Sequence, residues 1–185
     1  MLFERPHEGA GLGLAALIYG CAACAVAAQP EPLRVSITTH LGDRQEFQEG
    51  DRVQFLLDLN RDAYILLIYQ DARGALTQMI PNNTDRSGYF KAARYLGIPD
   101  ARTPFQFVVG PPFGTETVWV YAAPQPFPEL AGAVLDNGLK RLSASHTGMA
   151  AVLQTYARQK DLQYVSANVQ LSTHPGTPAS NSKRD

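Results

Sequence analysis

The sequence predicts a mainly β protein: an antiparallel, Ig-like β-sandwich of about seven strands, with one or two helices inserted before the last strand. Apolar and polar residues alternate with a period of two over several short stretches, as in strands with one buried face. Gly, Pro, Asn and Asp separate these stretches and indicate turns. Helix-type spacing begins only after Pro124. A closed barrel built from the same strands is the structural alternative.

The predicted strands differ in how they are expected to be covered. Residues 53–59 alternate cleanly and predict a half-buried strand, whereas residues 63–69 are apolar on both faces and predict a central strand covered on both sides. The other predicted strands are residues 33–40, 76–80, 105–109, 117–123 and, at the end of the domain, 162–171.

Two helices are expected between the last two strands. Residues 128–135 predict a short helix that ends near Asn137-Gly138. Residues 149–160 predict a longer one, because apolar residues recur there at roughly i, i+3 and i+4 spacing.

Residues 82–104 contain many turn-forming residues and predict a long irregular excursion. A compact domain seldom carries such a loop unless the loop is functional or ordered by local packing. Within it, residues 82–97 interleave basic and aromatic side chains, which suit the binding of a glycan, a peptide or a partner surface. The other interpretation is that the aromatic rings pack beneath the loop. The candidate binding residues are Arg86, Tyr89, Phe90, Lys91, Arg94 and Tyr95.

Residues 1–28 differ from the rest of the chain. No charged residue occurs from position 9 to position 28, and the apolar run ends in small residues followed by a polar, Pro-rich stretch, which is typical of a secretory signal. An uncleaved membrane anchor is the rival interpretation. Ile18-Tyr19-Gly20-Cys21 resembles a bacterial lipobox, so Cys21 is a candidate lipidation site. The predicted organisation is a signal peptide or lipoprotein signal over 1–28, one domain over 29–171 and a disordered tail over 172–185.

The sequence lacks the usual marks of catalysis or of cofactor binding. The formal net charge of −1 gives no basic footprint for nucleic acid. Asp58-x-Asn60-x-Asp62 has the spacing of a calcium loop but lacks its Gly and distal Glu. There is no G-x-S-x-G elbow, no metal-type histidine pair and no phosphate loop. No catalytic residue, metal or cofactor is therefore expected.

A series of motifs over residues 45–125 resembles one bacterial domain family. The motifs are Phe47-x-x-Gly50-Asp51-x-Val53, Asp62-Ala63-Tyr64, Tyr69-x-Asp71-x-x-Gly74, Gln78-x-Ile80-Pro81-Asn82, Ile98-Pro99 and Gly110-Pro111-x-x-Gly114-x-Glu116. In this order they resemble DUF4384, a family of unknown function. The resemblance implies an exported or envelope-associated protein, often a lipoprotein, and it implies no catalytic activity.

These observations predict a non-enzymatic exported module that acts by protein–protein interaction, for instance as an accessory component of an envelope or secretion assembly. The expected location is the periplasm of a Gram-negative bacterium, or its outer membrane through a lipid on Cys21. One alternative is a periplasmic protein that binds a glycan or a small molecule on Trp119, Tyr121 or Tyr89. A hydrolase with a dispersed site is a third.

Overall fold

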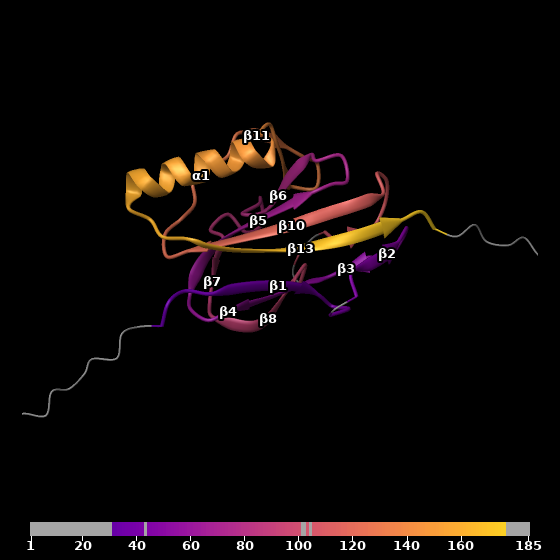
Figure 1. Ribbon diagram of the computed structural model, residues 1–185, viewed down its shortest axis with the longest axis horizontal. Helices are drawn as coiled ribbons and strands as arrows, with labels where there is room; N and C mark the ends of the chain where they lie inside the picture. Colours follow the sequence, from indigo (N-terminus) through magenta and orange to yellow (C-terminus); the bar gives the residue numbers. More distant parts are fainter. Residues whose placement is uncertain (1–30, 43, 101–102, 104, 177–185) are drawn as a thin grey trace, which may run out of the picture. The chain divides into compact units, whose positions relative to one another are not determined.

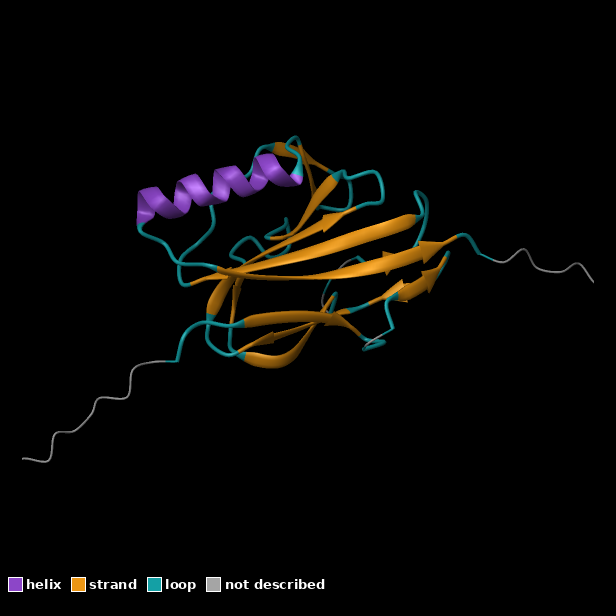
Figure 2. Ribbon diagram, viewed as in Figure 1, coloured by secondary structure: helices purple, strands orange, loops and turns teal. Residues whose placement is uncertain are grey.

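The computed structural model describes residues 31–42, 44–100, 103 and 105–176. The chain divides into two units, Met1–Glu31 and Pro32–Asp185. The second unit is mainly β, with sheets that do not close into a barrel and one helix among its described residues (Figures 1 and 2). The predicted signal segment 1–28, and with it Cys21, lies outside the described residues.

The largest sheet has the strand order β11-β12-β6-β5-β10-β13-β2, and a further short strand, β7, also pairs with β5. All its pairs are antiparallel except the parallel pair of β13 with β2. The strands are β2 (Glu46–Gln48), β5 (Ala63–Gln70), β6 (Leu76–Ile80), β7 (Tyr89–Phe90), β10 (Gly114–Ala123), β11 (Gly132–Val134), β12 (Lys140–Leu142) and β13 (Val165–His174).

A three-stranded antiparallel sheet of order β1-β4-β8 lies against one face of the large sheet. Its strands are β1 (Val35–Thr39), β4 (Phe55–Leu59) and β8 (Ala93–Ile98). A short ribbon of β3 (Arg52–Val53) and β9 (Phe107–Val108) is the third sheet.

Strand β5 of the large sheet is covered on both faces, as its apolar sequence predicts. Leu67 on one face of β5 joins the core shared with the three-stranded sheet, including Leu57 of β4. Leu66 and Ile68 on the other face pack against helix α1 (His146–Lys160) through Met149 and Leu153. Figure 2 shows the helix and the small sheet on opposite sides of the large sheet.

Helix α1 begins and ends at well-defined caps. The Ser145 side chain accepts a hydrogen bond from the Gly148 amide at 3.3 Å. At the other end, Asp161 adopts the left-handed conformation that closes the last turn. The helix predicted over 149–160 is thus confirmed, with one turn more at its N-terminal end.

Two sequence predictions need correction. Residues 128–135 do not form a helix, because β11 and β12 make a hairpin in which Gly138, with φ of 80°, donates to Leu135 at 2.9 Å. The stretch 82–97 is not one irregular loop, since it contains β7 and most of β8. In addition, β13 extends to His174, three residues past the predicted end of the domain. The Ig-like strand arrangement stays a prediction.

Candidate binding site

The stretch with the candidate binding residues crosses from one sheet to the other. β7 pairs with the start of β5, as in Tyr64 opposite Tyr89, and β8 pairs with β4, as in Leu59 opposite Ala93. Both the β4–β5 and the β7–β8 connections therefore pass between the sheets at the same end of the fold. Backbone pairing orders this part of the chain.

Asp62 holds this crossover in place. Its Oδ2 accepts hydrogen bonds from the Lys91 ammonium at 2.7 Å and the Tyr89 hydroxyl at 3.1 Å, and its Oδ1 accepts the Ala92 amide at 2.9 Å. The hydrogen bond from Lys91, followed by that from Ala92, lowers the pKa of Asp62 to about 2. The same contact raises the pKa of Lys91.

The structure divides the six candidate residues among different roles. The Tyr89 ring packs on Tyr64 with centroids 5.1 Å apart, and Phe90 packs against the core between the sheets. With Lys91 bound to Asp62, these residues follow the local-packing interpretation. Tyr89 and Lys91 are themselves exposed, as are the remaining three, Arg86, Arg94 and Tyr95.

Arg94 and Tyr95 form a bulge on β8. The register shifts there, because Leu57 faces Leu96 whereas Leu59 faces Ala93. Tyr95 has a φ of 58° and a side chain that is 71% exposed. The bulge turns this ring out to solvent.

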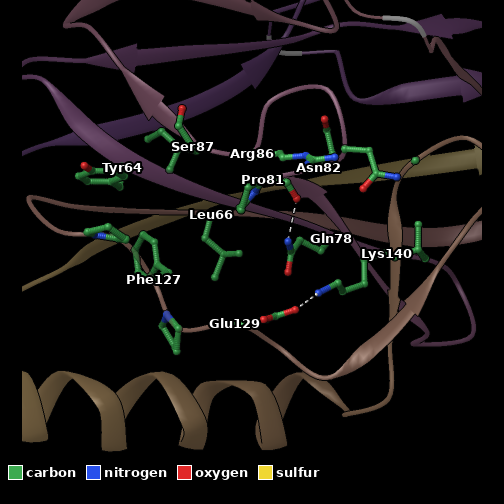
Figure 3. A pocket seen from close by; sticks show the side chains of 16 residues that line it. Tyr64, Leu66, Gln78, Pro81, Asn82, Arg86, Ser87, Phe127, Glu129 and Lys140 are labelled. Atoms are coloured by element: carbon green, nitrogen blue, oxygen red, sulfur yellow. Dashed lines mark hydrogen bonds and ion pairs between the residues drawn. The ribbon is translucent and has the colours of Figure 1, made fainter.

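Arg86 lines a pocket of about 450 Å³ at an edge of the large sheet, called here the sheet-edge pocket (Figure 3). Three segments enclose it: residues 81–87 after β6, residues 126–129 after β10, and the β11–β12 hairpin. The lining residues are Tyr64, Ile65, Leu66, Gln78, Pro81, Asn82, Asn83, Arg86, Ser87, Pro126, Phe127, Pro128, Glu129, Val134, Gly138 and Lys140.

The wall after β6 is fixed by side-chain-to-backbone hydrogen bonds. Asn82 Oδ1 accepts the amides of Thr84 and Asp85, each at 2.8 Å, and its Nδ2 donates to the Met79 carbonyl at 2.8 Å. The Asn83 amide donates to the Gly138 carbonyl at 3.2 Å and so joins this wall to the hairpin. The pocket is therefore preformed.

The sheet-edge pocket combines an apolar surface with charged groups. Leu66 and Phe127 supply the apolar surface (Figure 3). Lys140 Nζ, on a side chain only 18% exposed, donates to Glu129 Oε1 at 3.0 Å and to the Leu130 carbonyl at 3.3 Å. Glu129 is 89% exposed, so the rim of the pocket carries a paired acid and base. Such a lining suits an extended chain with both apolar and polar groups.

The sequence identified Arg86 as a candidate but missed the other functional groups of this pocket. No local sequence pattern marks Lys140 or Phe127 as a pocket residue. Lys140 reaches the pocket through the pairing of β12 with β6, and Phe127 reaches it through the path of residues 124–131. Asn82 was recognised only as part of a turn.

Two aromatic residues considered as stacking surfaces face helix α1. The Trp119 ring stacks on His146 with centroids 4.1 Å apart at 25°. The Tyr121 hydroxyl lies 3.2 Å from His146 Nε2, and its side chain is 6% exposed. Burial lowers the pKa of His146. His146 thus covers one face of the Trp119 ring, and the Tyr121 ring is buried.

Within the described part of the chain, no group of three or more His, Cys, Asp or Glu residues is placed to hold a metal ion. Over the same residues, no helix has the length and hydrophobicity needed to cross a bilayer.

Comparison with known sequences identifies one family. The sequence pattern of the family described as "Domain of unknown function (DUF4384)" matches residues 46–126, which confirms the resemblance predicted over 45–125. No curated protein and no solved structure matches the chain. The matched segment supplies the β6 side of the sheet-edge pocket, whereas Phe127, Glu129 and Lys140 come from the segment that follows it.

Proposed function

We propose that this protein, whose residues 46–126 belong to the DUF4384 family, is a non-enzymatic module of the cell envelope that binds a partner protein at the sheet-edge pocket. The observation that carries the proposal is the position of the pocket. It opens beside β11, the terminal strand of the large sheet.

An extended polypeptide segment fits this position best. All three residues of β11 are exposed, and Val134, which lines the pocket, is 57% exposed. A terminal strand offers backbone groups to an added strand, and a neighbouring pocket takes alternate side chains of that strand. Leu66 and Phe127 would contact an apolar side chain, while Arg86 and Glu129 would contact polar groups at the rim.

The proposed location is the envelope of a Gram-negative bacterium, either the periplasm or the outer membrane through a lipid on Cys21. The support is the sequence of residues 1–28 and the family membership. Labelling of cells with radioactive palmitate tests it. Label on the wild-type protein and none on Cys21→Ala would support lipidation, whereas equal labelling of both would contradict it.

The binding proposal is tested with two matched charge reversals. Arg86→Glu changes an exposed arginine at the rim of the pocket, and Arg73→Glu changes an exposed arginine in the β5–β6 hairpin, away from the pocket. In the native host, chemical crosslinking of the full-length protein should give a partner adduct that Arg86→Glu diminishes and Arg73→Glu leaves intact. An adduct unchanged by Arg86→Glu, or diminished equally by both, would contradict the proposal.

A further inference from the structure

A second cavity lies between the two larger sheets, at the end of β5 that is farther from Asp62. It has a volume of about 180 Å³ and is called here the Glu116 pocket. The β3–β9 ribbon and the turn after β9 border it. Its lining residues are Val53, Phe55, Tyr69, Phe107, Val108, Val109, Gly110, Pro111, Glu116 and Leu171.

Glu116 occupies a position where the strand pattern calls for an apolar residue. In β10, Val118 and Val120 face the core between the sheets, and the alternation of the strand places Glu116 on the same face. Its side chain is only 5% exposed. The sequence of β10 thus places a buried carboxyl group between the two larger sheets.

Two hydroxyl groups contact this carboxyl. The Thr173 hydroxyl accepts the Gly114 amide at 3.1 Å, and its single proton has two acceptors within reach, Glu116 Oε1 at 3.1 Å and the Gly114 carbonyl at 3.2 Å. The Tyr69 hydroxyl donates to Glu116, and burial followed by this hydrogen bond raises the pKa of Tyr69. Both hydroxyl groups are neutral, so neither compensates a negative charge.

No cation pairs with Glu116 among the described residues. Burial raises the pKa of its carboxyl, and the negative charge of Asp71 raises it further. A buried carboxylate is stable when a cation reaches it. The cavity beside Glu116 is where such a cation has room.

Aromatic rings and apolar side chains form the rest of the pocket. Phe55 and Phe107 meet edge to face with centroids 5.4 Å apart, and Tyr69 and Phe107 have centroids 6.3 Å apart. Aromatic faces attract cations, and apolar walls pack against the methylene groups that carry an ammonium. An alkyl chain with a charged end fits this lining better than a strongly hydrated inorganic ion does, because most of the walls are apolar.

We propose that the Glu116 pocket binds an alkylammonium group, either the end of a lysine side chain or a small primary amine. The ammonium donates to the Glu116 carboxylate, and its alkyl chain lies against Phe107 and Leu171. This site is separate from the sheet-edge pocket, so the two proposals stand or fall independently.

Binding to the full-length protein is measured by NMR with three probes: n-butylammonium, the uncharged n-butanol, and the peptide acetyl-Ala-Lys-Ala-amide. n-Butylammonium should shift the amide signals of Gly114, Glu116 and Thr173, whereas n-butanol should not. Tighter binding of the peptide would assign the site to a lysine side chain, and tighter binding of the free amine would assign it to small amines. Absence of binding by both amines would overturn the proposal.

Two matched variants locate the site. Glu116→Gln keeps the shape and an acceptor for Tyr69 and Thr173 but removes the charge, and it should weaken n-butylammonium binding by about tenfold or more. Asp58→Asn removes an exposed carboxylate from β4 and should leave the affinity unchanged. Equal affinity of Glu116→Gln and the wild type would overturn the proposal.

A measurement on the wild-type protein keeps the test decisive if Glu116→Gln fails to fold. By linkage, a cation that binds beside the ionised carboxylate must lower the pKa of Glu116. A carbon-13 titration of the Glu116 carboxyl should therefore show a lower pKa with saturating n-butylammonium than with n-butanol. An unchanged pKa would contradict binding at this group.

Discussion

The Lys91 ammonium donates to the Asp62 carboxylate at 2.7 Å, and this contact joins the two connections by which the chain passes between its sheets. Asp62 lies on the β4–β5 connection and Lys91 on the β7–β8 connection. The same carboxylate accepts the Ala92 amide and the Tyr89 hydroxyl. One acidic side chain therefore orders a segment whose composition resembles that of an irregular loop.

Asp62→Asn should change how stability depends on acidic pH. The pKa of Asp62 is about 2 in the folded protein, against an ordinary value of 3.8 for an aspartate. A lowered folded-state pKa contributes stability above about pH 4 that is lost as the pH falls through about 2. Thermal unfolding is followed between pH 5 and pH 2, roughly the range over which the carboxyl titrates. Over this range Asp62→Asn should lose less stability than the wild type. An identical loss in wild type and variant would contradict this role.

At position 95 a glycine substitution should destabilise the protein less than an alanine substitution, which is the reverse of the usual order. The Tyr95 φ of 58° is left-handed, a conformation that costs a non-glycine residue about 1–2 kcal/mol. Tyr95→Gly should thus be more stable than Tyr95→Ala by about 1 kcal/mol in urea unfolding. At the neighbouring Arg94, where φ is not positive, alanine should be the more stable of the pair. The same order at both positions would argue against the bulge.

Helix α1 should stabilise the fold through one face only. Leu153 is 1% exposed and packs on the large sheet, so Leu153→Ala should lower the free energy of unfolding by about 2–5 kcal/mol. Val152, one position earlier, is 46% exposed, and Val152→Ala should change the free energy of unfolding by less than about 0.5 kcal/mol. Equal effects in denaturant unfolding would show that the helix does not pack as described.

Glu116→Gln should alter the pH dependence of stability in the opposite sense to Asp62→Asn. Because the folded-state pKa of Glu116 is raised, its stabilising contribution is present below the unfolded-state value of about 4.5 and is lost as the pH rises through the folded-state value. The free energy of unfolding of Glu116→Gln minus that of the wild type should therefore be more positive at neutral pH than near pH 4. The charged and titratable groups that act on this carboxyl are Asp71 and Tyr69, and the Arg141 guanidinium acts in turn on Tyr69. A stability difference independent of pH would contradict the assignment.

The sequence predicted those elements whose pattern reflects their final environment. Residues 63–69 are apolar on both faces, and β5 is covered on both faces by the small sheet and by α1. Residues 128–135 misled because Leu130 and Val134 are four positions apart, as on one face of a helix, while the turn at Asn137-Gly138 directs the chain into a hairpin. The crossover was missed because the hydrogen bonds of Asp62 reach 27 to 30 residues along the chain, beyond any local pattern.

The candidate site was only partly predictable for the same reason. Arg86 was identified from the composition of its own segment. Lys140 and Phe127 join it through strand pairing and chain path, neither of which leaves a local signature. Glu116 was recognised as a motif residue, but its burial follows from the face of β10 on which the register places it.

The central claim is that the sheet-edge pocket binds a partner protein, and site-specific photocrosslinking in living cells tests it most directly. A benzophenone amino acid replaces Val134, which lines the pocket at 57% exposure, or Val152, which lies on α1 at 46% exposure. We expect a discrete adduct with one envelope protein from position 134 and none from position 152. No adduct from position 134, or the same adducts from both positions, would contradict the account.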